Sequence, residues 1–95
     1  MYQVIFTDAY LKLAEKWIKK HRILKDKYYN TIQMLEINPF HNSLRLHKLK
    51  GEISEFYSVS IDLKHRIIID FLIEDNKITL LNIGDHSVYN SGPKY

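Results

Sequence analysis

Apolar residues recur at helical spacing through the first third of the chain. A short apolar run at residues 2–6 predicts a strand, and Thr7 then offers a side-chain oxygen that can cap a helix. From there to Ile18, apolar positions follow at intervals of three and four residues with lysines between them, which predicts an amphipathic helix. A second pattern of this kind covers residues 24–35 and ends before Pro39, because proline disfavours helical geometry in the residue that precedes it. The two helices are nearly contiguous, so we expect a helical hairpin.

The period changes to two in the second half of the chain. At residues 57–61 large apolar side chains alternate with Ser58 and Ser60, which is typical of a strand with one buried face and one polar face. Residues 66–73 form a nearly continuous apolar run, as expected for a central strand covered on both sides. A further turn leads to a last strand at residues 78–83.

These elements follow the order β-α-α-β-β-β. The last three strands are joined by short turns and predict an antiparallel meander, with the first strand at an edge of the sheet. The segment at residues 38–51 is expected to be a polar, basic connection. We therefore predict an α+β fold, an antiparallel sheet with a two-helix hairpin packed on one face. A chain of 95 residues has little room for a second core, so residues 1–95 are expected to form a single domain.

Charge is distributed unevenly along the chain. Residues 10–50 carry ten lysines and arginines against three acidic residues, whereas from Gly51 onward four basic residues face seven acidic ones. The basic half could attract a polyanion or an acidic protein partner. Lysine-rich amphipathic helices that are merely solvated on their outer faces would give the same composition, so charge alone leaves both interpretations open.

Composition excludes several classes of function. The chain contains no cysteine, which excludes disulfides, thiolate zinc sites and a cysteine nucleophile. Its longest uncharged apolar run is about half the length of a membrane span, and no secretory signal is visible. The histidines show no spacing typical of metal ligands. We therefore expect a cytoplasmic protein that does not bind a membrane.

Ionisable side chains gather where the predicted strands begin and end. Some lead into the meander, some lie in or beside its first turn, and others follow the last strand. In an antiparallel meander such groups can converge on one surface. The candidates are Arg45, His47, Lys48, Lys50, Lys64, His65, Arg66, His86 and Tyr89.

This set of side chains suits metal-free cleavage of RNA. In that reaction a base takes the proton of a ribose 2′-hydroxyl, the oxygen attacks the adjacent phosphate, and an acid protonates the departing 5′ oxygen. Histidine exchanges protons near neutral pH, arginine pairs with two phosphate oxygens at once, and tyrosine stacks on unpaired bases.

Each candidate also has an ordinary structural interpretation. A single histidine at a strand end is more often a surface residue or a satisfied one than a catalyst. Arg66 could serve only to pair with Asp62 or Asp70, and Tyr89 could anchor the end of the chain by packing. The residues alone leave both interpretations open.

Three segments resemble the RelE/ParE toxin superfamily of bacterial and archaeal toxin–antitoxin systems, and in particular its RelE/YafQ/YoeB-like members. Residues 44–61, LRLHKLKGEISEFYSVSI, resemble the family pattern L-x-H/K-x-L-x-G followed by Y-S. Residues 62–71, DLKHRIIIDF, are similar to its x-x-H/Y-R-[ILV]-[ILV] strand start, and residues 83–89, IGDHSVY, to its closing [IV]-G-x-H/R and V-Y. The three motifs stand in the family's order and cover about half of the chain.

The resemblance implies an endoribonuclease that cuts mRNA in the ribosomal A site, inhibits translation and is neutralised by a cognate antitoxin. By position, Arg66 matches the arginine that stabilises the transition-state phosphate, and His86 matches a catalytic histidine or arginine. His47 would be the partner of His86 in proton transfer, and Tyr89 matches a tyrosine that orients the substrate. The residues expected to bind RNA are Arg45, Lys48, Lys50, Lys64 and His65. No cofactor is implied, and operator DNA would be bound only through the toxin–antitoxin complex.

Departures from the family pattern keep two other functions open. Ser58 and Ser60 stand where relatives carry basic residues or a histidine, and Lys50, Lys64 or His65 would have to substitute for them. A ParE-like inhibitor of DNA gyrase is the rival within the superfamily, although the closing motif argues against it. The third possibility is a non-catalytic module whose basic half binds an acidic antitoxin.

Overall fold

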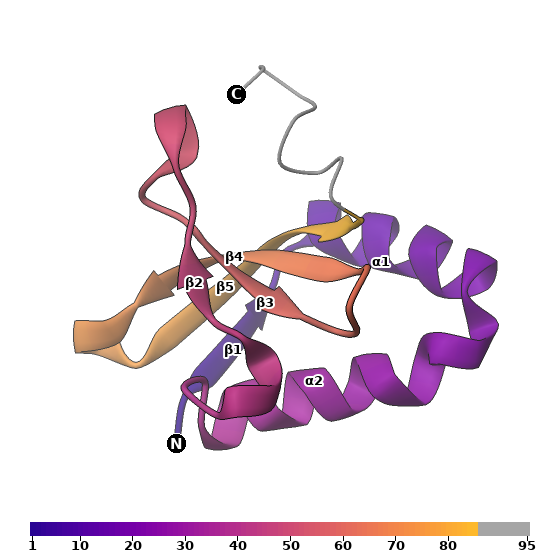
Figure 1. Ribbon diagram of the computed structural model, residues 1–95, viewed down its shortest axis with the longest axis horizontal. Helices are drawn as coiled ribbons and strands as arrows, with labels where there is room; N and C mark the ends of the chain where they lie inside the picture. The colour runs from indigo at the N-terminus through magenta and orange to yellow at the C-terminus, as the bar shows by residue number, and fades with distance from the viewer. Residues whose placement is uncertain (86–95) are drawn as a thin grey trace.

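In the computed structural model of the chain, residues 1–85 are described. Two helices, α1 (Asp8–Lys20) and α2 (Lys25–Ile37), are joined by a 3-10 turn and lie on one face of a five-stranded sheet (Figure 1). The strands are β1 (Gln3–Phe6), β2 (His47–Lys48), β3 (Tyr57–Ser60), β4 (Arg66–Leu72) and β5 (Lys77–Gly84). Their order in the sheet is β1-β5-β4-β3-β2. Within residues 1–85 no helix combines the length and hydrophobicity that crossing a membrane requires.

The helical hairpin forms where the sequence predicts it. Thr7 caps α1, since its Oγ1 accepts a hydrogen bond of 3.1 Å from the backbone N–H of Tyr10. At the other end, α2 stops at Ile37, and Asn38 is extended as expected for a residue before proline. The sequence predicts an apolar stripe of Leu11, Ala14 and Ile18 flanked by Leu13 and Trp17, whereas the buried residues of α1 are Tyr10, Ala14 and Trp17.

The sheet is mixed, whereas the sequence predicts an antiparallel one. The β3-β4-β5 meander is antiparallel as predicted, but β1 pairs with β5 in parallel, with Val4 opposite Ile78. A parallel pair needs a long crossover, and the whole helical hairpin and meander separate these two strands in the chain. The first strand does lie at an edge of the sheet, as predicted.

The connection at residues 38–51 contains a strand that the sequence does not predict. His47 and Lys48 form β2 and pair with Ser58 and Tyr57 of β3. A strand of two residues is too short to display a period of two, and polar side chains give it no apolar face. The consequence is that His47 belongs to the sheet and has a fixed direction.

The sheet has apolar contacts on both faces, as predicted for its central strand. Val59, Ile67 and Ile69 are fully buried beneath the helices, and Ile68 packs on the opposite face in a second cluster with Leu49. The remaining members of this second cluster are Ile53, Phe56 and Leu81. Leu81 joins it through a β-bulge, because Ile68 pairs with Asn82 and Ile69 pairs with Leu80.

Candidate functional site

The face of the sheet opposite the helices, called the open face here, carries four polar side chains in neighbouring rows. Residues directly opposite each other in an antiparallel pair have side chains on the same face, and so do residues i and i+2 of one strand. His47 lies opposite Ser58, and Arg66 lies opposite Ser60 two residues further along β3. The pairing of β2, β3 and β4 therefore brings His47, Ser58, Ser60 and Arg66 onto one surface.

Arg66 is held in place by Ser60. Its Nη1 donates a hydrogen bond of 3.0 Å to Ser60 Oγ, and Ser60 itself is buried. A guanidinium is always charged at physiological pH and presents several donors in one plane, which suits it to bind a phosphate. The residue that departs from the family pattern thus acts as an acceptor that orients the arginine.

His47 is exposed on β2 and oriented by the backbone next to it. Its Nδ1 lies 3.1 Å from the carbonyl oxygen of Arg45, which can only accept, so Nδ1 carries the proton. The basic lone pair of the neutral ring is then on Nε2. Two strand spacings and two residues separate His47 from Arg66, which corresponds to roughly 12 Å between their Cα atoms. Side chains of this length can approach the same nucleotide from two sides.

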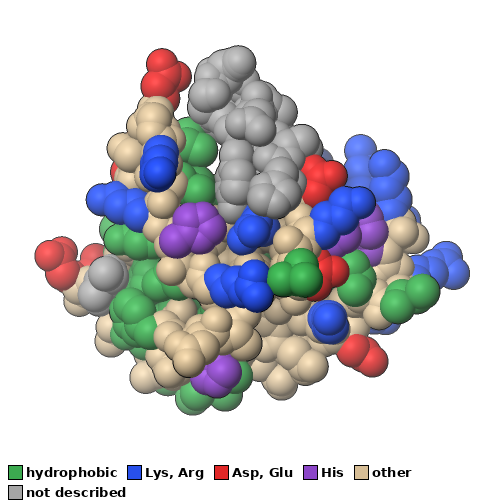
Figure 2. Space-filling model, in the orientation of Figure 1, with side chains coloured by type: hydrophobic (Ala, Val, Ile, Leu, Met, Phe, Trp, Pro, Cys, Tyr) green, Lys and Arg blue, Asp and Glu red, His purple; other side chains and the backbone are tan. Residues whose placement is uncertain are grey.

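Basic side chains surround this surface. Arg45, Lys48, Lys50 and Lys64 are all exposed, and Figure 2 shows lysine, arginine and histidine side chains gathered around β2 and β3. Lys48 follows His47 in β2, so its side chain leaves the strand on the other side. Arg45, Lys48 and Lys50 come from the segment around β2, with Lys48 directed away from the open face, and Lys64 comes from the turn before β4.

Arg45 has a backbone conformation that most residues avoid. It follows the 3-10 turn Asn42–Leu44 with φ 49° and ψ 46°, in the left-handed region. A non-glycine residue there costs about 1 kcal/mol relative to right-handed geometry. This conformation directs the chain into β2 and sets the carbonyl that orients His47.

His65 does not lie on the open face. Its side chain is buried against Trp17 and His21, with ring centroids 5.4 Å and 4.7 Å away. Its Nδ1 lies 3.1 Å from Asp62 Oδ1, which accepts. The expected RNA contact of His65 is therefore not supported by its position, because the ring packs against α1.

Asp62 organises the turn that leads to Arg66. Its Oδ1 accepts hydrogen bonds from the backbone N–H groups of Lys64 and His65, at 2.9 and 2.7 Å. Burial by itself would raise the pKa of Asp62, but the hydrogen bonds from His65 and Lys64 outweigh it and lower the pKa below its ordinary value. An ionised Asp62 thus fixes the start of β4.

The two remaining candidates, His86 and Tyr89, lie outside the described residues. Gly84, the last residue of β5, pairs with Arg66, so β5 ends beside the arginine. Among residues 1–85 no group of three or more histidine, aspartate or glutamate side chains is placed to hold a metal ion.

Sequence reasoning missed the supporting roles of Ser60 and Asp62. Ser60 precedes Arg66 by six residues, and a tight turn between two strands places such positions opposite each other. That spacing, together with a carboxylate at the first turn position, is the signal that could have found both residues.

Comparison with known proteins finds similarity in structure only. No protein-family model matches the chain, and no curated protein matches it in sequence. YafQ from E. coli strain BL21(DE3) superposes with a TM-score of 0.76 and 13% sequence identity, covering 96% of this chain and 100% of YafQ. The YoeB/ParE toxin from Agrobacterium tumefaciens gives a TM-score of 0.70 with 17% identity, over 88% of this chain and 98% of that one.

A toxin–antitoxin complex is also among the similar structures. In the YoeB–YefM complex from Staphylococcus aureus, the matching chain has a TM-score of 0.66 and 18% identity, over 90% of this chain and 98% of that one. These matches cover nearly the whole of both chains, so the helical hairpin, the mixed sheet and the meander are shared together. The chain has the fold of the YafQ and YoeB toxins, which is the RelE-like fold.

Proposed function

We propose that this protein is the toxin of a type II toxin–antitoxin system, an endoribonuclease that cuts mRNA on the ribosome. The observation that carries the proposal is the placement of Arg66 and His47 on one face of the sheet, with Arg66 bonded to Ser60. The fold shared with the YafQ and YoeB toxins supports it. The proposed place of action is the cytoplasm, where mRNA and ribosomes are found.

The reaction needs proton transfer and charge stabilisation but no covalent enzyme intermediate. A base removes the 2′-hydroxyl proton, the 2′ oxygen bonds to the adjacent phosphorus, and the bond from phosphorus to the 5′ oxygen breaks. The products are a 2′,3′-cyclic phosphate and a 5′-hydroxyl end, which receives a proton from the acid. In this proposal Arg66 stabilises the phosphoryl charge, and His47 and His86 exchange the protons.

The substrate is held by cations and by stacking. Arg45, Lys48, Lys50 and Lys64 are the proposed phosphate contacts, and Tyr89 is the proposed stacking residue. His65 is left out of this set because its ring is buried against α1. Four dispersed cations bind RNA weakly by themselves, which favours a ribosome that presents the mRNA.

The proposed protein partner is an antitoxin. Similar structures include the E. coli DinJ–YafQ complex and a heterotetrameric YoeB–YefM toxin–antitoxin complex from Staphylococcus aureus. For this chain, the basic segment at residues 10–50 suits an acidic partner. Operator DNA would be contacted only through the complex.

The test is cleavage of mRNA on programmed ribosomes, with the chemistry of the cut ends determined. We expect cuts in the A-site codon that leave a 5′-hydroxyl end. Cuts that leave 5′-phosphate ends would contradict the proposed mechanism. Growth arrest with DNA breaks and intact mRNA would instead indicate a gyrase inhibitor.

A further inference from the structure

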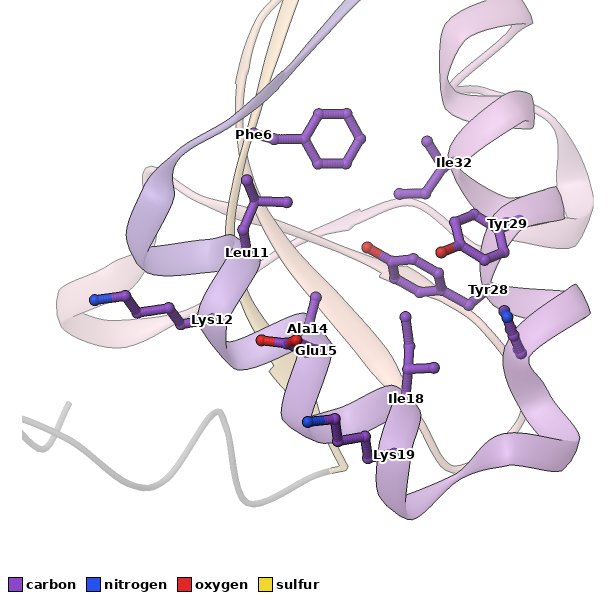
Figure 3. A pocket seen from close by; sticks show the side chains of 11 residues that line it. Phe6, Leu11, Lys12, Ala14, Glu15, Ile18, Lys19, Tyr28, Tyr29 and Ile32 are labelled. Atoms are coloured by element: carbon purple, nitrogen blue, oxygen red, sulfur yellow. The ribbon is translucent and has the colours of Figure 1, made fainter.

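The two sides of the sheet differ in the ligands that they suit. On the helical side a groove of about 550 Å³ lies between α1 and α2, and apolar side chains such as Leu11, Ile18 and Ile32 form most of its walls (Figure 3). Apolar walls offer no hydrogen-bond donors to a phosphoryl group. A further contact to the proposed substrate is therefore expected on the open face, beside Arg66.

A β-bulge in β5 changes which residues of that strand lie on the open face. Leu80 is buried in the core, and a regular strand would place Asn82, two residues later, on the same buried face. Leu81 is instead inserted as an extra residue, so that Asn82 pairs with Ile68. Asn82 therefore shares the open face with Ile68, and Ile83 is buried in the core in its place.

The shifted register places Asn82 next to Arg66. Arg66 lies opposite Gly84, so Asn82 is its diagonal neighbour, with about 7–8 Å between the Cα atoms. Gly84 has no side chain that could separate the two. Ser60 bonds to the guanidinium from β3, on the other side of β4. A phosphoryl group bound by Arg66 is thus within reach of Asn82, and bulges beside active sites commonly aim a side chain in this way.

The amide of Asn82 has its oxygen bonded within the strand and its nitrogen available. Oδ1 accepts a hydrogen bond of 2.8 Å from the backbone N–H of Ile83. This bond identifies the two ends of the amide, because an N–H donor pairs with the oxygen and not with the NH2 group. Asn82 is half-buried, and within residues 1–85 no hydrogen bond of its NH2 group is found. The NH2 group can therefore donate to a bound molecule.

We propose that Asn82 Nδ2 donates a hydrogen bond to a non-bridging oxygen of the scissile phosphate, beside the guanidinium of Arg66. The inference rests on the proposed function, because it adds a contact to the same site. Negative charge grows on the non-bridging oxygens as the 2′ oxygen bonds to phosphorus, so a donor in this position binds the transition state more tightly than the ground state. The bond to Ile83 orients the donor before the substrate arrives.

The test is a set of variants of the full chain, assayed for mRNA cleavage on programmed ribosomes. Asn82→Asp keeps an oxygen that accepts from Ile83 but has no NH2 group, and Asn82→Leu has a similar size with neither donor nor charge. Both are expected to lower the cleavage rate constant about 10²-fold at saturating substrate, which is the usual cost of losing one donor to a developing oxyanion. Thr79→Val is the matched control, since Thr79 is a half-buried polar residue of β5 that lies opposite Asp70 and not beside Arg66. Its kinetics are expected to equal those of the wild type.

The two Asn82 variants separate a substrate contact from other roles. If Asn82 served only to hold the bulge, Asn82→Asp would cut at the wild-type rate and Asn82→Leu would be impaired, and the proposal fails. If Asn82→Asp alone were impaired and recovered at high salt, its charge would be the cause, and the proposal fails as well. Losses that depend on the bases of the A-site codon would indicate a contact to a base instead of the phosphate. Melting temperatures near that of the wild type show that the variants fold.

A second measurement does not depend on cleavage. The side-chain amide of Asn82 gives a pair of proton–nitrogen signals in NMR spectra, which are assigned by their loss in Asn82→Asp. A 2′-O-methylated RNA trinucleotide, which cannot be cut, is expected to shift these signals in the wild type and to shift them less in Arg66→Ala.

The inference and the proposed function fail in different ways. Signals of Asn82 that shift in a wild-type protein that cuts no RNA would overturn the nuclease and leave the phosphate contact standing. Cleavage that needs Arg66 but proceeds at the wild-type rate in both Asn82 variants, with no shift of the signals, would overturn the phosphate contact and leave the nuclease standing.

Discussion

Arg66 Nη1 and Ser60 Oγ are joined by a hydrogen bond of 3.0 Å across the β3–β4 pair. The bond links the one arginine of β4 to a buried hydroxyl directly opposite it. A planar guanidinium bound on one edge has fewer orientations open to it, which lowers the entropy lost when it binds a phosphate. Ser60 is thus a positioning residue for Arg66.

Replacing Ser60 tests this positioning role. Ser60→Ala is expected to reduce the rate constant of mRNA cleavage about tenfold, because the guanidinium is no longer oriented, with a loss of about 1 kcal/mol in unfolding free energy. Ser60→Thr keeps a hydroxyl at this position and is expected to recover most of the activity. Single-turnover kinetics separate the rate constant from substrate affinity. Wild-type kinetics for Ser60→Ala would show that the bond has no part in catalysis.

The turn at Asp62 predicts a dependence of stability on pH. Because the folded-state pKa of Asp62 is lowered, its ionised form stabilises the fold at and above the ordinary value of 3.8. This contribution is lost as the pH falls from 3.8 through the lowered pKa. Asp62→Asn keeps an oxygen acceptor without the charge, so it is expected to cost about 1 kcal/mol at neutral pH. Denaturant unfolding from pH 2 to pH 7 should show the unfolding free energies of the wild type and of Asp62→Asn becoming equal at low pH. A difference between the two that stays constant over this pH range would contradict this account.

His65 and its neighbour Lys64 provide a matched pair. His65→Ala removes a buried ring that contacts Trp17 and His21, so a loss of about 2 kcal/mol in unfolding free energy is expected, with RNA affinity unchanged. Lys64→Ala is expected to leave stability within about 0.5 kcal/mol and to lower the salt slope of RNA binding by about one. Chemical denaturation and RNA titration at several salt concentrations measure both quantities. If His65→Ala lowered RNA affinity and left the unfolding free energy unchanged, His65 would be an RNA contact.

Because the backbone of Arg45 is left-handed, a glycine at this position is expected to stabilise the fold and to weaken RNA binding. Glycine adopts φ 49° without steric cost, so Arg45→Gly is expected to raise the unfolding free energy by up to about 1 kcal/mol. The same change removes a cation from the proposed RNA surface and should weaken RNA binding severalfold. Thermal unfolding and RNA titration of the same variant check both effects. A less stable variant would show that the arginine side chain, not the backbone, determines this position.

Much of the fold follows from local patterns in the sequence. Thr7 and Pro39 bound the helical hairpin through capping and backbone restriction, and both effects are local. The meander likewise follows from alternation and turn residues. Contacts that depend on distant segments could not be predicted in this way. The parallel pairing of β1, the two-residue strand at His47 and the bulge that turns Leu81 outward all depend on which strand lies alongside.

Part of the candidate site could also be predicted from the sequence, and part of it depends on contacts between distant segments. Arg66 and His47 could be selected from residue type and from the resemblance, and the structure brings them to one face. The burial of His65 against Trp17 and His21 could not be foreseen, because it depends on how the end of α1 meets the turn before β4. The role of Ser60 could not be predicted either, because it is a partner of Arg66 only through the register of β3 and β4.

The most direct test of the central claim compares the wild type with Arg66→Ala and His86→Ala on programmed ribosomes, with antitoxin binding measured for each. The account predicts that A-site cuts by the wild type fall by about 10²-fold or more in Arg66→Ala and strongly in His86→Ala, while both variants bind the antitoxin normally. Cleavage by Arg66→Ala at the wild-type rate would contradict it.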